Sequence, residues 1–189
     1  MKKIILFTCA ALTLSAFNKL HAQDDASMKA WQAYMTPGDI HKMLATSDGT
    51  WNEDITMWMA PGTEPMKSIS TAENKMILGG RYQQSTHTGT FNGMPFEGMG
   101  LLGYDNAKKI FNSTWIDNMG TGIMQMQGTL DPTGKIINFT GTSVDPSTGK
   151  DMNVRQVFTI IDNDHQMMEM YMTANGKEFK TMEIKLTRK

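Results

Sequence analysis

The sequence has little cysteine and no concentration of positive charge, and both absences exclude classes of function. Its one cysteine, Cys9, lies in an apolar stretch near the start of the chain. The rest of the chain therefore has no disulfide, no thiol nucleophile and no zinc–thiolate site. The formal net charge is −1, and lysine and arginine form no basic cluster. A chain of this kind is not expected to bind nucleic acid.

The usual signatures of enzymes are also missing. His41, His87 and His165 are isolated in the sequence, so no pair of histidines has the spacing of a zinc site. There is no Gly-x-Ser-x-Gly nucleophile elbow and no glycine-rich loop suited to phosphate. The best pair for acid–base work is Glu169 beside Tyr171. The sequence favours a protein that is not an enzyme and that needs no cofactor.

Long hydrophobic runs are limited to one, at residues 4–17. A lysine pair at 2–3 precedes this run, and Leu20-His21-Ala22 follows it. The pattern predicts a secretory signal peptide over residues 1–22, too short for a membrane span, with the mature chain starting at Gln23. Its removal leaves 167 residues and takes away three lysines, which changes the formal charge from −1 to −4. We therefore expect a secreted or periplasmic protein of one domain.

Residues 23–47 have helical periodicity. Ser27 is expected to cap a first short helix. A second helix is predicted from about Pro37 to Ala45, where Thr36 and Asp39 have the spacing of a capping box. Apolar residues at helical spacing mark one side of these two helices: Met28, Trp31, Met35, Ile40, Met43 and Leu44.

Residues 48–189 carry strand and turn patterns. Ten segments are strand candidates: 50–59, 66–78, 80–90, 94–105, 109–117, 121–130, 135–143, 151–161, 165–174 and 178–188. Dense turn signals separate them, and connections this short cannot link parallel neighbours. Closure of such a sheet removes its exposed edges. We predict an all-β fold, an antiparallel up-and-down β-barrel of about ten strands after a short N-terminal helical segment.

A motif at the two ends of the β region supports closure. Gly49-Thr50-Trp51 enters the first strand, and Arg188 ends the last one. In lipocalin-like barrels a basic side chain of the final strand covers the tryptophan of such a Gly-x-Trp motif. The first and last strands become neighbours when a barrel closes, so a guanidinium can stack on the indole and bond carbonyls at the barrel end. We expect Trp51 and Arg188 to be structural residues in contact.

Several longer segments carry a family resemblance when taken in order. They are His41-Lys42-Met43-Leu44-Ala45, Leu78-Gly79-Gly80-Arg81-Tyr82, Phe96 to Asn106, Thr114 to Gly122, and Glu169-Met170-Tyr171. Together with Gly49-Thr50-Trp51 they resemble a bacterial family known as domain of unknown function 1579, over about Pro37 to Arg188. The resemblance implies a calycin-type, lipocalin-like barrel. It implies no reaction.

The barrel interior is the expected binding site. About ten strands enclose more volume than the eight that side chains just fill, and glycines at 79–80 and within 98–103 leave parts of the wall bare. Aromatic rings would supply stacking area, and charged groups would orient a polar end. The predicted ligand-binding residues are Arg81, Tyr104, Trp115, Asp117, Glu169 and Tyr171. We expect a small apolar or amphipathic ligand; a packed interior is the alternative, and the oligomeric state stays open.

Methionine is the compositional outlier, with 19 residues in the chain. Met168, Met170 and Met172 alternate along one predicted strand and so share a face. In an exported protein such thioethers, with His165 nearby, are suitable ligands for Cu(I). The alternative is that methionine fills the core in place of leucine, which is scarce here. Copper handling, or an enzyme that uses the same cavity, is thus the alternative to ligand binding.

Overall fold

A computed structural model describes residues 25–174 and 176–189. The predicted signal peptide, residues 1–22, lies outside the described residues. The chain divides into two compact units, residues 1–36 and residues 37–189. In the first unit the described helix already includes Asp25 and continues to Met35, so the prediction that Ser27 caps it is wrong. No helix in the described ranges is long and apolar enough to cross a membrane.

The second unit begins with helix α2 (Asp39–Ala45). Gly38 is its N-cap, and the Gly38 N–H donates to Nδ1 of His41 at 3.1 Å. The expected capping role of Asp39 is wrong, because its carboxylate instead accepts from Nζ of Lys42 at 2.8 Å, one turn further along the helix. The imidazole of His41 therefore performs the capping function that the sequence pattern assigns to the carboxylate of Asp39.

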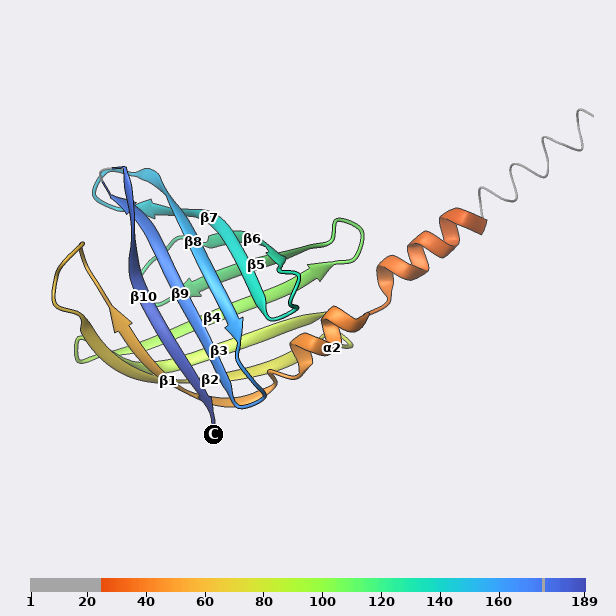
Figure 1. Cartoon of the computed structure of the whole chain (residues 1–189), viewed down its shortest axis with the longest axis horizontal. Coiled ribbons are helices and arrows are strands. Elements are labelled where there is room, and N and C mark those ends of the chain that lie inside the picture. Colours follow the sequence, from red (N-terminus) through yellow and green to blue (C-terminus); the bar gives the residue numbers. More distant parts are fainter. Residues whose placement is uncertain (1–24, 175) are drawn as a thin grey trace, which may run out of the picture. The chain divides into compact units, whose positions relative to one another are not determined.

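Ten antiparallel strands follow α2 and form a closed barrel (Figure 1). Each strand pairs with the next along the chain, and β1 pairs with β10 to complete the circle. The predicted all-β, up-and-down barrel is therefore confirmed. The strands are β1 (Gly49–Met57), β2 (Met66–Ile77), β3 (Tyr82–Phe91), β4 (Met94–Asp105), β5 (Ile110–Asp117), β6 (Met124–Leu130), β7 (Ile136–Asp145), β8 (Lys150–Ile160), β9 (His165–Ala174) and β10 (Lys177–Arg188).

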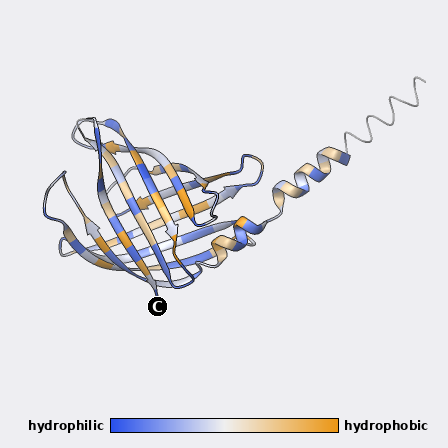
Figure 2. Ribbon diagram, in the orientation of Figure 1, coloured by the Kyte–Doolittle hydropathy of each residue, from blue (hydrophilic) through white to orange (hydrophobic). Residues whose placement is uncertain are grey.

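Side chains alternate between the barrel interior and its outer face along each strand, and Figure 2 shows hydrophobic and hydrophilic bands along the strands. The inward apolar residues near α2 form the main core, which consists of Leu44, Phe111, Met126, Ile137, Phe139 and Val154. Leu44 comes from α2, and this helix contacts β2 and β3. Helix α2 thus closes one end of the barrel and belongs to the same compact unit.

Arg188 lies over the indole of Trp51 at the seam between β1 and β10. The two residues are register partners, and the guanidinium carbon is 4.3 Å from the ring centroid. Arg188 also donates to the carbonyls of Thr46 at 2.6 Å and Asp48 at 2.8 Å. Gly49 has a φ of +117°, and a Cβ there would lie 3.2 Å from Nη1 of Arg188. The contact expected from the sequence is present, and glycine makes room for it.

The glycines at 79 and 80 occupy a different place from the one predicted. They lie in the turn between β2 and β3, with φ of +67° and +79°, and not inside a strand. Their conformation favours glycine for the turn itself. They therefore leave no bare wall inside the barrel, whereas Gly98 and Gly100 are within β4 as expected.

Candidate functional site

A cavity of about 400 Å³ lies inside the barrel. Leu44 and Ser47, at the end of α2, border it on one side. Phe91 and Met119 border it near the β3–β4 and β5–β6 connections at the other end of the barrel. The volume falls within the usual range for sites that bind small molecules. Side chains therefore do not fill the whole interior.

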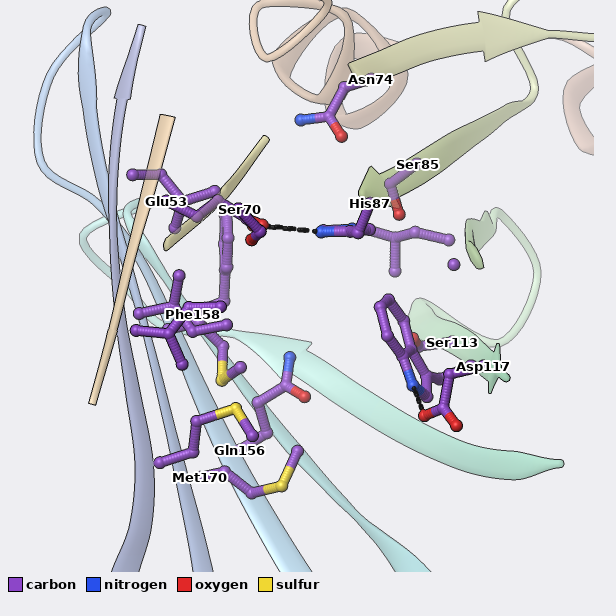
Figure 3. A pocket seen from close by; sticks show the side chains of 18 of the residues that line it. Glu53, Ser70, Asn74, Ser85, His87, Ser113, Asp117, Gln156, Phe158 and Met170 are labelled. Carbon is purple, nitrogen blue, oxygen red and sulfur yellow. Dashed lines mark hydrogen bonds and ion pairs between the residues drawn. The ribbon is translucent and has the colours of Figure 1, made fainter. Parts of the chain in front are cut away.

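The cavity has a polar wall and an apolar wall. In Figure 3 His87 and Ser85 lie on one side of the view, and Phe158 and Met170 lie on the other. Strands β1, β2, β3 and β5 supply most of the polar lining, which includes Glu53, Ser68, Ser70, Ser85, His87 and Ser113. The lining that strands β8 to β10 supply is mainly apolar and includes Phe158, Ile160, Met168, Met170, Met182 and Ile184. A cavity of this kind suits a molecule with one polar end.

A buried carboxylate is the centre of the polar wall. Glu53 is only 2 % exposed, and its carboxylate accepts a hydrogen bond from the hydroxyl of Ser70. Nδ1 of His87 lies 3.1 Å from both carboxylate oxygens of Glu53 (Figure 3). An ionised carboxylate can only accept, so Nδ1 carries the proton. In the neutral imidazole, Nε2 of His87 is then left with its lone pair.

Small residues on β2 and β4 allow the His87 side chain on β3 to contact Glu53 on one side and Trp115 on the other. Ala72 on β2 and Gly98 on β4 are the register partners of His87 on β3. Across Gly98, the ring of Trp115 lies edge-on to the His87 ring, with 4.9 Å between centroids. A Cβ on Gly98 would be 2.4 Å from the Trp115 ring. The glycine is thus required for the ring to lie against the wall.

Asp117 holds the indole of Trp115 in place. Nε1 of Trp115 donates to Oδ2 of Asp117 at 2.8 Å, and both residues line the cavity. The other carboxylate oxygen accepts from the backbone N–H groups of Met119 at 2.9 Å and Gly120 at 3.2 Å. Asp117 therefore joins the Trp115 ring to the loop after β5.

Three side-chain amides bind the end of α2 at the floor of the cavity. Asn74 donates to the carbonyl of Ser47 at 3.2 Å, and Gln83 donates to the carbonyl of Leu44 at 2.7 Å. Gln166 donates to the hydroxyl of Ser47 at 2.6 Å. The carbonyl of Leu44 belongs to the last turn of α2 and also accepts from the Ser47 N–H, while Ser47 follows the helix. The Oε1 atom of Gln166 is buried and accepts no hydrogen bond from the described residues.

Four of the six predicted ligand-binding residues do not line the cavity. Two of these lie toward the α2 end of the barrel. Tyr104 points inward but packs into the core below the cavity, with its ring 4.9 Å from that of Phe111. Arg81 is exposed in the turn between β2 and β3 and donates to a carbonyl of that turn. Only Trp115 and Asp117 of the predicted set border the cavity.

The other two, Glu169 and Tyr171, lie on the outer face of β9. Glu169 forms an ion pair with Lys180 at 2.5 Å, and the Arg155 guanidinium lies 3.9 Å from the Tyr171 ring centroid. Burial alone would lower the pKa of Lys180, but the hydrogen bonds that its ammonium donates to Glu169 and Glu183 raise it. Strand alternation explains the error, because Met170 between them points into the cavity.

Of the proposed copper ligands, His165 is separated from the three methionines. Met168 and Met170 line the cavity, and Met172 packs against the main core. His165 is exposed, and its Nδ1 lies 2.9 Å from a carboxylate oxygen of Asp162. An odd-numbered residue of β9 faces away from its even-numbered methionines. In the described part of the chain, no three His, Cys, Asp or Glu side chains form a cluster suited to a metal ion.

The sequence interpretation missed the polar centre of the cavity. On β1, Glu53 alternates along the same face with Trp51 and Ile55. A carboxylate among inward-facing apolar residues was the sequence feature that could have identified Glu53 as a site residue. His87 was noted only as an isolated histidine. Its partner is 34 positions away in the sequence, and strand register alone brings the two together.

Comparison with known proteins supports the fold. The sequence model of the family described as "Protein of unknown function (DUF1579)" matches residues 36–188. Among solved structures, the crystal structure of Rv2717c from M. tuberculosis is similar, with a TM-score of 0.61 and 17% sequence identity. That match covers 82% of this chain and 99% of the other. At this identity the likeness shows the fold alone. No curated protein matches the chain significantly.

Proposed function

This chain belongs to the DUF1579 family, and we propose that it binds a small apolar or amphipathic molecule inside its barrel. The observation that carries the proposal is the cavity of about 400 Å³ with one polar and one apolar wall. Methionine side chains on the apolar wall are flexible and polarizable, so they adapt to a ligand whose shape is not rigidly specified. The role requires no bond to be made or broken.

The proposed place of action is outside the cytoplasm. It rests on residues 1–22, where a lysine pair, an apolar run and a small-residue cleavage site follow each other. N-terminal sequencing of protein from fractionated cells tests it. A mature chain beginning at or near Gln23 supports export, and an intact Met1 contradicts it.

Native mass spectrometry of protein purified from its own host tests the binding role. A retained ligand adds its mass to that of the chain, and mild heating or organic solvent then removes it. Recombinant protein can also be titrated with Nile red, an uncharged dye whose fluorescence rises in apolar surroundings. The proposal predicts an emission increase that saturates at one dye per chain. Absence of both a retained mass and saturable dye binding contradicts it.

Two neighbouring substitutions make the dye experiment specific to the interior. Ser85 lines the cavity, and Thr86 is exposed on the outer face of the same strand. Ser85→Phe is expected to fill the cavity and weaken dye binding at least about tenfold, a change of about 1.4 kcal/mol. Thr86→Phe adds the same ring outside and is expected to leave dye binding unchanged. Equal effects of the two substitutions would place the dye on the surface.

A second candidate function, acid–base catalysis, rests on Glu53 and His87. A carboxylate that bonds Nδ1 fixes the imidazole tautomer and leaves Nε2 as a base, and here this base lies on a cavity wall. Once a retained ligand is identified, it can be incubated with wild-type protein and with His87→Asn. A change in ligand mass that requires His87 supports an enzyme, and an unchanged ligand supports binding alone.

A further inference from the structure

On the polar wall of the cavity, the donors next to the two carboxylates are directed at those carboxylates. The hydroxyl of Ser70 donates to Glu53, and Nδ1 of His87 bonds the same carboxylate. The indole N–H of Trp115 donates to Asp117. These three donors are therefore not available to a ligand, whereas the hydroxyls of Ser68, Ser85 and Ser113 can donate or accept.

The amide groups on the floor show the same arrangement. The side-chain N–H groups of Asn74, Gln83 and Gln166 are directed at the end of α2. The carbonyl oxygen of Gln166 has no partner among the described residues, although that side chain is only 3 % exposed and lines the cavity. A buried acceptor without a donor costs free energy, which a donor on a bound molecule removes.

The charges on the wall have one sign. Glu53 and Asp117 both line the cavity, and none of the described lining residues is a lysine or an arginine. A carboxylate has about four acceptor positions, so Glu53 keeps acceptor capacity after bonding Ser70 and His87. Repulsion between like charges is strong in a water-poor interior, and an anionic ligand has no cation there to offset it.

We infer that the polar end of the ligand is a hydrogen-bond donor, uncharged or cationic, such as an alcohol or an amine, and that carboxylate-bearing molecules such as fatty acid anions are rejected. The inference rests on the proposed binding function and adds the chemical class of the ligand. The donor end lies against Glu53 and Gln166. The hydrocarbon part lies against the methionines of β9 and β10.

The experiment compares three molecules with the same hydrocarbon tail: 1-decanol, decylamine and decanoate. Their dissociation constants are measured at neutral pH and physiological salt, by calorimetry or by displacement of Nile red. Decanol and decylamine are expected to bind at least about tenfold more tightly than decanoate. Binding of decanoate as tight as that of the other two overturns the inference and leaves the proposed function intact. If none of the three binds and Nile red does not bind either, the proposed function itself fails.

Two variants locate the selectivity within the cavity. Glu53→Gln removes the buried negative charge and is expected to reduce the preference for decylamine over decanoate about tenfold. Glu73→Gln makes the same chemical change at an exposed position of β2 and is expected to leave the preference unchanged. An unaltered preference in folded Glu53→Gln overturns the role of Glu53. The comparison of the three ligands on unaltered protein decides the donor requirement even if this variant does not fold.

Discussion

Glu53 on β1 and His87 on β3 contact each other across an intervening strand, with Nδ1 of His87 3.1 Å from each carboxylate oxygen. The strand between them presents Ser70 and Ala72 to the interior, and both side chains are small. The contact between Glu53 and His87 thus depends on the small size of the β2 side chains between them as well as on the two residues themselves. A double-mutant cycle with Glu53→Gln and His87→Gln is expected to give a coupling energy of about 0.5–3 kcal/mol in denaturant unfolding.

The exposed pair of Arg155 and Glu178 serves as the reference for that cycle. Its closest nitrogen–oxygen distance is 2.6 Å, shorter than in the buried pair, but solvent screens it. We expect its coupling energy to be clearly smaller. Equal coupling in the two cycles would show that burial adds nothing to the contact of Glu53 with His87.

The bare backbone at Gly98 is expected to be essential for the position of Trp115. Gly98→Ala places a methyl group 2.4 Å from the indole ring, so the ring must move or the strands must separate. The expected loss is about 1–3 kcal/mol of unfolding free energy, together with a shift in tryptophan emission. Gly120→Ala is the control, because no atom lies within 4 Å of the added Cβ. A fully stable Gly98→Ala protein with unchanged emission would contradict the packing described here.

The seam of the barrel is expected to depend on Arg188. Replacement by alanine removes the cation–π contact with Trp51 and the bonds to the carbonyls of Thr46 and Asp48. The expected destabilisation is about 1–2 kcal/mol, the scale of a partly desolvated cation–π contact. Lys185→Ala, an exposed change on the same strand, is expected to have little effect. An unchanged unfolding midpoint for Arg188→Ala would argue against its role in closure.

Stability is expected to fall in mildly acidic solution because of His41. Burial lowers the pKa of His41 below its ordinary value of 6.5, and the Gly38 N–H bonds the neutral Nδ1. Above about pH 6.5 both the folded and the unfolded chain leave this group neutral. As the pH falls below that value, the unfolded chain takes up the proton first, so the unfolding free energy decreases. Urea unfolding at a series of pH values measures this slope.

Substitution of His41 with glutamine tests whether this histidine causes the loss of stability in mildly acidic solution. His41→Gln keeps an acceptor for the Gly38 N–H, as a capping box requires, but it cannot titrate. It is expected to flatten the dependence of the unfolding free energy on pH, whereas His165→Gln, a change at an exposed histidine, is expected to retain it. An unchanged slope in His41→Gln would assign the effect to another group.

The fold could be predicted from the sequence because its determinants are local. Turn signals such as Asp131-Pro132-Thr133-Gly134 separate the strands, and the predicted strand limits agree with the observed ones within a few residues. The connections between the strands are too short for parallel neighbours, so consecutive strands had to be antiparallel. The helix starts were less predictable, since His41, and not the expected Asp39, accepts from the N–H of the N-cap residue Gly38.

The site could be predicted only in part, because it depends on which side chains share a face and a level of the barrel. Trp115 and Asp117 were predicted correctly as cavity residues because one is aromatic and the other is charged. Glu169 was predicted to face the cavity. Its alternation with Met168 and Met170 along β9 already indicated that it faces outward if those methionines face inward. Glu53 and His87 join strands that are distant in sequence, and no local pattern reports the strand register that brings them together.

The central claim is that the barrel interior holds a ligand between the polar wall at Glu53 and the apolar wall at Met168. A crystal structure of protein purified from its own host, or soaked with 1-decanol, tests this most directly. Continuous electron density is expected within the cavity, with a polar end within hydrogen-bond distance of Glu53 or Gln166. An interior closed by repacked side chains, with no space for a ligand, would contradict it.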